Sequence, residues 1–264
     1  MIKSFKILAI LFTGAILLSS CDSDIPVAEL KAKYLKTNSA FIDIDGVSVH
    51  YIMEGRMDDS LPIVFIHGTS ASLHTWDTLS NLLKTNKKII RLDLPAFGLT
   101  GPNRLNQYSF NYYNQFLDEF LLKLNVTQCI VAGNSLGGSI AWNYAIASPD
   151  KVKKFILLDA SGYPKKDEKG SLGFKLAGIP VLNQALKHIS PISLIRKSLE
   201  DAFYNKSLVT EKMVQQYQDM LLREGNRAAV LELFQHPMKP DPAKIKTITQ
   251  PTLIIWGKQD QLIS

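Results

Sequence analysis

Short apolar runs alternate with amphipathic segments along most of the chain. The first regular pattern is an alternation of apolar and polar residues over positions 41–54, interrupted by Asp45-Gly46, and it predicts a β-hairpin. Later runs are short and mostly apolar, as in strands that are buried on both faces of a sheet. These runs cover residues 61–67, 88–94, 129–132 and 152–158.

The segments between these runs have helical spacing. Apolar residues recur every three or four positions in 74–83 and 108–124, and a third helix is predicted over 136–147, ending at Ser148-Pro149. Strands and helices that alternate in this way form β-α-β units. We therefore predict an α/β fold with a mostly parallel sheet that helices cover on both faces.

The alternation stops in the second half of the chain. Residues 164–246 contain helical patterns, at 192–203 and 209–224, and no buried strand, before a strand is predicted at 252–256. We expect a helical insertion in such a sheet to form a cap over the active-site edge. The predicted organisation is a core over 41–163, a cap over 164–246 and a return to the core over 247–264.

The N-terminus has the pattern of an export signal. A basic start is followed by an apolar run over residues 7–18, too short for a transmembrane helix of about 20 residues. The next residues, Leu18-Ser19-Ser20-Cys21, resemble a bacterial lipobox, in which the cysteine receives lipid. We expect 1–20 to be a lipoprotein signal peptide and 21–40 a tether, with the protein anchored to a membrane of the bacterial cell envelope. The alternative is a plain signal peptide with an incidental cysteine.

Composition and charge narrow the possible functions. Of the 264 residues, 46% are hydrophobic, which is enough for one large core. The net charge of +6 is not gathered into a stripe, and no basic-aromatic pattern suggests nucleic acid as a partner. Cys21 and Cys129 are the two cysteines, and no cysteine or histidine spacing suggests metal ligands, so we expect no metal or cofactor.

A five-residue motif carries the main chemical signal. Gly133-Asn134-Ser135-Leu136-Gly137 matches G-x-S-x-G, between a predicted buried strand and a predicted helix. A sharp turn from strand to helix forces a strained backbone on the serine and lifts its hydroxyl above the sheet. Glycines on either side leave room for the neighbouring strand and helix. The motif therefore predicts that Ser135 is a nucleophile.

Further segments give the chain a resemblance to a known family. A His67-Gly68 pair ends one buried strand, and Ala96 lies in a turn similar to the motif D-x-P-G-x-G, where the family usually has glycine. From about residue 41 to its end, the chain resembles the α/β-hydrolase superfamily, and within it the capped, esterase-like serine hydrolases. The matching segments are 65–69, 93–98, 133–137, 157–159 and 255–260.

The resemblance implies roles for particular residues. Asp260 is the expected triad acid, and Asp159 is the runner-up. The backbone amides of Leu136 and Thr69 are the expected oxyanion donors, with Ser70 as the fallback for Thr69. His67 and Gly68 are expected to support this oxyanion loop.

The base of the triad has no counterpart in the expected place. In this family the order is serine, acid, histidine, with the histidine roughly 30 residues after the acid. All five histidines precede Asp260: His50, His67, His74, His188 and His236. We expect the sequence to be truncated before the last strand, its helix and the histidine, which would impair the chain as given. The alternatives are a degenerate enzyme, or a cap histidine that serves as the base.

Three functions remain in view. The first is hydrolysis of small, apolar carboxylic esters through an acyl-enzyme, with the cap supplying an apolar pocket. The second is carbon–carbon bond hydrolysis of the meta-cleavage-product type. The segment from Gly133 to Gly138 resembles that group's elbow, the strand-turn-helix motif that carries the nucleophile. The third is a non-catalytic binding protein. Haloalkane dehalogenases and epoxide hydrolases use an aspartate at the elbow, so Ser135 argues against them.

Overall fold

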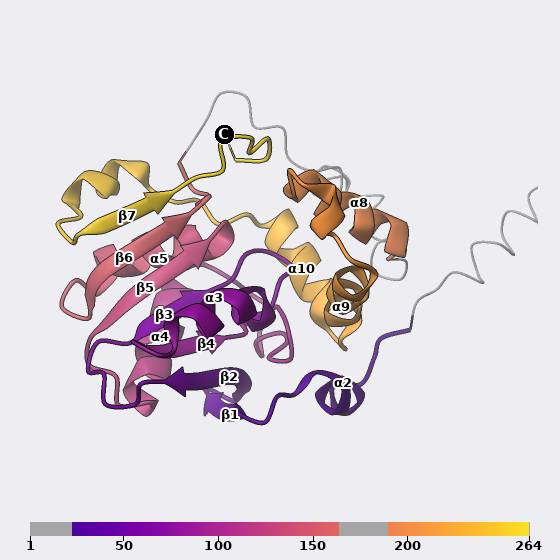
Figure 1. Ribbon diagram of the computed structural model, residues 1–264, viewed down its shortest axis with the longest axis horizontal. Coiled ribbons are helices and arrows are strands. Elements are labelled where there is room, and N and C mark those ends of the chain that lie inside the picture. The colour runs from indigo at the N-terminus through magenta and orange to yellow at the C-terminus, as the bar shows by residue number, and fades with distance from the viewer. Residues whose placement is uncertain (1–22, 164–189, 264) are drawn as a thin grey trace, which may run out of the picture.

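The computed structural model describes residues 23–163 and 190–263. Its centre is a seven-stranded sheet with the strand order β1-β2-β4-β3-β5-β6-β7 (Figure 1). The strands are β1 (Ser39–Ile44), β2 (Val47–Gly55), β3 (Ile63–Ile66), β4 (Lys88–Leu92), β5 (Cys129–Asn134), β6 (Val152–Leu158) and β7 (Thr252–Ile255).

The sheet is antiparallel at one edge and parallel elsewhere. The hairpin β1–β2 is antiparallel, as is the pairing of β2 with β4. From β4 to β7 every neighbouring pair of strands is parallel. Parallel strands need crossover connections, and the connecting helices then cover the sheet. The predicted mostly parallel sheet is confirmed.

Helices cover both faces of this sheet. Alternate residues of β3 show the two faces, because Val64 and Ile66 belong to one apolar cluster whereas Ile63 and Phe65 belong to another. The larger cluster includes α4 (Phe110–Lys123) and α5 (Leu136–Ala147). The smaller one lies under η1 (Leu73–Trp76) and α3 (Asp77–Leu83). The predicted α/β fold class is confirmed.

The described part of the expected cap is helical. It contains α8 (Ile192–Ala202), η2 (Lys206–Leu208), α9 (Glu211–Leu222), α10 (Asn226–Gln235) and η3 (Pro242–Thr247). Figure 1 shows α8 and α9 beside the sheet, and α10 closer to it. Ala229, Val230 and Leu233 of α10 are buried in the larger core cluster, so this helix belongs to the core as much as to the cap. Residues 164–189 of the expected cap lie outside the described residues.

The segment that we expected to be a tether is folded over its described part, which corrects that expectation for residues 23–40. It forms α2 (Val27–Tyr34) and the start of β1. Ile25 N donates to Leu222 O at 2.7 Å, and Glu224 N donates to Ile25 O at 3.0 Å. Leu30, 1% exposed, packs in a cluster with Leu99 and Met220. The segment therefore joins the end of α9 to the core.

Charged groups add to this attachment. Lys33 Nζ and Tyr34 Oη both donate to Asp219 Oδ2 on α9, at 2.6 and 2.7 Å. Asp24 forms an ion pair with the buried guanidinium of Arg227 at 2.5 Å. In each ion pair one partner is buried (Asp219, Arg227) and the other reaches solvent (Lys33, Asp24), so these pairs add to the apolar contact of Leu30 in holding the segment. The predicted signal peptide and Cys21 lie outside the described residues, and no helix described here is long and apolar enough to cross a membrane.

The attachment of α2 predicts unequal effects of two leucine substitutions. Leu30→Ala should lower the free energy of unfolding by about 3 kcal/mol, because it leaves a cavity against Leu99 and Met220. Leu35→Ala, at a position 42% exposed just after the same helix, should cost under about 1 kcal/mol. Urea denaturation of both variants measures the difference, and equal, small effects would show that the segment is not packed.

Candidate active site

Ser135 lies at the junction between β5 and α5. Its backbone has φ 53° and ψ −120°, in the positive-φ region that non-glycine residues rarely adopt. Such a conformation costs on the order of 1–3 kcal/mol and persists only where the surroundings enforce it. Ser135 N donates to Leu158 O at 3.2 Å, which ties the turn to the end of β6. The strained residue is the one that the sequence motif predicts to be the nucleophile.

The glycines of the motif are required by close backbone contacts. A Cβ on Gly133 would lie 2.1 Å from Gly137 O, and a Cβ on Gly137 would lie 2.2 Å from Ile66 O. Both distances are far shorter than any van der Waals contact. The start of α5 therefore packs directly on the ends of β5 and β3, which leaves no room for side chains at these two positions.

The oxyanion loop, defined as residues 68–72, passes beside Ser135. A Cβ on Gly68 would lie 3.1 Å from Ser135 Cβ. Within the described residues, the amides of Leu136 and Thr69 donate no hydrogen bond. The Leu136 amide is in the first turn of α5, where helical N–H groups lack partners and the helix dipole favours negative charge. These two amides belong to residues next to Ser135 and to Gly68, and they have no hydrogen-bond acceptor within the described part of the chain.

His67 is wholly buried at the start of the oxyanion loop. Its Nδ1 lies 2.8 Å from Gly68 O, and its Nε2 lies 3.0 Å from the Leu94 amide, which donates to it. These contacts assign a neutral ring with the proton on Nδ1. Burial lowers the pKa of His67, which agrees with the neutral form. With both nitrogens occupied, His67 holds the loop and has no free nitrogen for the Ser135 hydroxyl.

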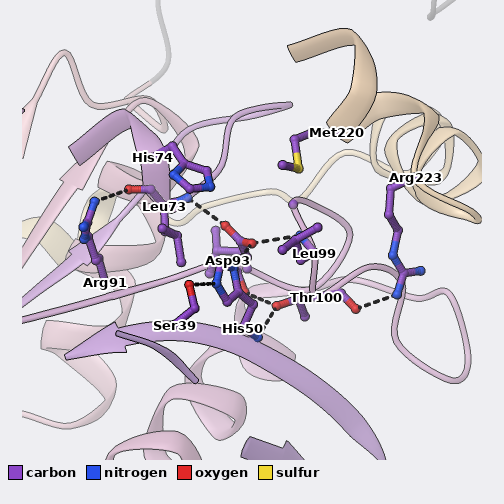
Figure 2. A network of polar contacts seen from close by, with 12 residues as sticks. Ser39, His50, Leu73, His74, Arg91, Asp93, Leu99, Thr100, Met220 and Arg223 are labelled. Atoms are coloured by element: carbon purple, nitrogen blue, oxygen red, sulfur yellow. Dashed lines mark hydrogen bonds and ion pairs between the residues drawn. The ribbon is translucent and has the colours of Figure 1, made fainter. Parts of the chain in front are cut away.

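Sequence reasoning gave no role to Asp93 and His50, which form a buried network (Figure 2). Asp93 Oδ1 accepts from Leu73 N at 2.7 Å. Asp93 Oδ2 accepts from Leu99 N and lies 2.8 Å from His50 Nδ1. The pKa of Asp93 is about 2, because interactions with His50 outweigh the burial that would raise it. The sequence feature that could have pointed to Asp93 is its position directly after a predicted buried strand.

The two candidate acids lie at the ends of neighbouring strands. Asp260 follows β7, and its Oδ1 accepts from Leu262 N and Ile263 N at 2.8 and 2.9 Å. Asp159 follows β6 with φ 43°, and its Oδ1 accepts from Gly257 N at 2.7 Å. Asp159 therefore binds the turn that leads to Asp260. The ends of β5, β6 and β7 are in register, which places both acids at the same sheet edge as Ser135.

No histidine among the described residues donates to or accepts from Ser135 Oγ. His50 and His67 are buried in the networks above, and His74 is 3.7 Å from Asp77 Oδ2. His236 is at the exposed end of α10, paired with Glu232 at 2.7 Å. His188 lies outside the described residues. The described structure therefore brings the predicted nucleophile, oxyanion amides and acid to one sheet edge without a base.

The cap meets the oxyanion loop at a small cavity of about 10 Å³. Ser70 and Ala71 line it from the loop, and Met220, Leu221 and Val230 line it from α9 and α10. A second cavity, of about 360 Å³, lies between Gln107 and Tyr108 on one side and α10 on the other. The cap histidine His236 lines it, whereas Ser135, Asp260 and the oxyanion loop do not.

The chain is similar to several known proteins. A model of the alpha/beta hydrolase fold matches residues 62–178. The uncharacterized hydrolase YugF of Bacillus subtilis is 29% identical over 224 residues, covering 83% of this chain and 80% of YugF. The human monoacylglycerol lipase ABHD6 is 26% identical over 267 residues, covering 90% of this chain and 78% of ABHD6.

A solved structure agrees with these matches. A meta-cleavage product hydrolase from Pseudomonas fluorescens superposes with a TM-score of 0.71 at 23% identity, covering 85% of this chain and 81% of that one. Sheet order, elbow and oxyanion loop together define an α/β-hydrolase fold. The chain therefore has the fold of the α/β hydrolases, and the match to that family's model covers residues 62–178.

The low pKa of Asp93 predicts how stability depends on pH. The folded pKa of about 2 is below the value of 3.8 expected when the chain is unfolded. This carboxylate therefore stabilises the fold above pH 3.8, by about 2 kcal/mol, and the contribution is lost as the pH falls toward 2. Asp93→Asn should cost about 3 kcal/mol at neutral pH. Urea denaturation should show that the difference in free energy of unfolding between wild type and Asp93→Asn becomes smaller as the pH falls from 5 to 2.5.

Asp58 offers a matched control. It is exposed and pairs with Arg56 at the surface, so Asp58→Asn should change stability little. If the difference in free energy of unfolding between wild type and Asp93→Asn stays constant with pH, the assignment of an ionised, hydrogen-bonded carboxylate is contradicted.

Proposed function

We propose that the protein is a serine hydrolase that cleaves carboxylic esters through an acyl-enzyme. The backbone of Ser135 carries this proposal, because a serine at φ 53° and ψ −120° between a buried strand and a helix is maintained at an energetic cost. Ordinary packing does not require that cost. A hydroxyl presented at a helix N-terminus beside unpaired amides suits nucleophilic attack on a carbonyl.

The steps follow from the positions of the groups. Ser135 Oγ attacks the ester carbonyl carbon, and its proton passes to the base. The Leu136 and Thr69 amides stabilise the resulting oxyanion; losing one such donor typically costs about 3 kcal/mol. The alcohol leaves with the proton from the base, and water then attacks the acyl-enzyme to release the acid. Asp260 orients the base.

We propose that the base is a histidine in a segment that follows Ser264. One observation that supports this is the exposure of β7, whose residues Leu253, Ile254 and Ile255 are 52%, 62% and 48% exposed. Apolar edge strands are normally covered or paired. The 264 residues alone should then keep only residual activity, because loss of a triad member leaves the oxyanion amides and binding.

The proposed substrate is a small, apolar ester. Support comes from the apolar character of the cap beside the oxyanion loop, where Met220, Leu221 and Val230 pack; the space of about 10 Å³ between them is too small to hold the substrate itself. The name of the similar human protein, a monoacylglycerol lipase, also describes an ester hydrolase. Neither observation defines the length of the acyl chain.

Carbon–carbon bond hydrolysis is the second candidate. Gly138 extends the elbow in the manner of meta-cleavage-product hydrolases, and a Cβ on Gly138 would lie 2.5 Å from Ala160 Cβ. The glycine is therefore required by packing as well, so it is weaker support than the backbone of Ser135.

We also propose that Cys21 carries lipid and anchors the protein to a membrane of the bacterial cell envelope. The support for this is the sequence Leu18-Ser19-Ser20-Cys21 directly after an apolar run. Asp24, three residues after Cys21, pairs with Arg227. Only a few residues would then separate a lipid at Cys21 from the folded protein.

Labelling with a fluorophosphonate tests the nucleophile. The full-length wild-type protein should be labelled, and Ser135→Ala should lose the label, because the probe forms its bond with an activated hydroxyl. Ser139→Ala, four residues along in the first turn of the same helix, is the matched control and should still be labelled. Equal labelling of Ser135→Ala and wild type would remove Ser135 from the mechanism.

The same preparations distinguish the candidate reactions. Turnover of p-nitrophenyl esters by wild type, lost in Ser135→Ala, is the expected result. Turnover of a ring-fission dienoate without ester turnover would favour the carbon–carbon hydrolase. Ligand binding without any turnover or labelling by the full-length protein would favour a binding protein.

Lipidation predicts a difference between the two cysteines. In cells fed labelled palmitate, wild type should incorporate label and sediment with membranes, whereas Cys21→Ser should do neither. Cys129→Ser is the control, because Cys129 is buried in the core and should leave lipidation unchanged. Membrane association that persists in Cys21→Ser without label would contradict the lipoprotein assignment.

A further inference from the structure

The two residues that follow β4 hold both ends of the oxyanion loop. At its start, the Leu94 amide donates to His67 Nε2 at 3.0 Å. At its end, Asp93 Oδ1 accepts from the Leu73 amide at 2.7 Å. The Thr69 amide, the predicted oxyanion donor, lies between these two attachments. The position of the loop therefore depends on the position of Asp93 and Leu94.

Asp93 is in turn bound to the loop that follows it. Asp93 Oδ2 accepts from Leu99 N at 2.8 Å. The Thr100 hydroxyl donates to Asp93 O at 2.8 Å and accepts from His50 N at 3.0 Å. All of these groups are buried, so their hydrogen bonds have no water to replace them. Residues 98–100 and Asp93 should consequently move together.

Residues at the junction of α9 and α10 hold this loop from the side of the cap. Arg223 Nη2 donates to Thr100 O at 3.3 Å, as Figure 2 shows. Asn226 Nδ2 donates to Gly98 O at 3.0 Å and to Met220 O at 2.6 Å. Between them, Gly225 adopts φ 85°, which allows the sharp turn that directs both side chains toward the loop.

Direct packing supplements the hydrogen bonds. The cavity of about 10 Å³ lies between Ser70 and Ala71 of the oxyanion loop and Met220 and Asn226 of the cap. This volume is close to the smallest that holds a single water. The loop therefore has little space in which to move while α9 and α10 remain in place.

We propose that Arg223 and Asn226 are positioning residues for the oxyanion loop. They hold residues 98–100 and, through Asp93 and Leu73, keep the Thr69 amide aligned with Ser135. The inference rests on the proposed hydrolase function, because it assigns the loop amide to the transition state. It predicts that the cap influences the chemical step as well as the shape of the substrate pocket.

Kinetics of Arg223→Met and Asn226→Ala in the full-length protein test the proposal. Hydrolysis of p-nitrophenyl butyrate should show kcat lowered by about tenfold to a hundredfold, with KM within about threefold, because only the transition state uses the loop amide. The rate of fluorophosphonate labelling should fall in parallel. Arg223→Lys keeps a donor for Thr100 O and should recover most of the loss. Lys212→Met, at an exposed position of α9, is the matched control and should behave as wild type.

A double-mutant comparison tests the route through residue 100. Thr100→Val removes the hydroxyl that binds Asp93 O and should lower kcat by itself. In the double variant with Arg223→Met, the two losses should combine to less than their product, because both loosen the same loop. Losses that simply multiply would overturn the coupling between Arg223 and the loop.

Other outcomes also overturn the proposal. A raised KM with unchanged kcat would make these residues part of the substrate pocket, and a lowered melting temperature with unchanged kcat would make them structural. Arg223→Met compared with Arg223→Lys decides the question even if Asn226→Ala does not fold. If wild type reacts with the probe but hydrolyses no ester, the proposed function fails while labelling rates still test the positioning. If wild type neither reacts with the probe nor hydrolyses esters, the proposed function and the positioning role both fail.

Discussion

The buried carboxylate of Asp93 connects segments that are far apart in the sequence. An ionised group that is removed from water is stable only if hydrogen bonds and opposite charge replace its hydration. Two backbone amides and the ring of His50 do so, and they come from β2, from η1 and from the loop after β4. One charged group thereby sets the relative positions of the first hairpin, the oxyanion loop and the part of the core that contacts the cap.

The elbow at Ser135 depends on a different kind of constraint. Its strained backbone is maintained because β5, α5 and the end of β3 approach so closely that Gly133 and Gly137 cannot carry side chains. The strain places a hydroxyl at the N-terminus of α5, beside amides without partners. Asp93 holds the facing loop in place by hydrogen bonds. Catalysis of ester hydrolysis, as proposed, requires both, because the nucleophile and the oxyanion donors must stay aligned during the reaction.

The N-terminal segment and the cap form one connected region. Ile25 pairs with the end of α9, Leu30 packs on Met220, and α9 continues through the junction that binds residues 98–100. If Cys21 carries lipid, as proposed, the membrane lies within a few residues of this region. The contacts run from α2 through α9 to the loop after β4.

The sequence by itself determined the order of strands and helices, the elbow with Ser135 and the fold class. These follow from local patterns, because a buried parallel strand must be apolar and a G-x-S-x-G turn depends on five adjacent residues. The prediction of a tether was wrong for residues 23–40, because a single buried leucine in a charged helix does not stand out in the pattern of apolar and polar residues. The roles of His50, Asp93, Arg223 and Asn226 were decided by tertiary structure, since their partners lie up to 128 residues away. Hydrogen bonds of buried groups depend on how elements pack, and periodicity along the chain does not contain that information.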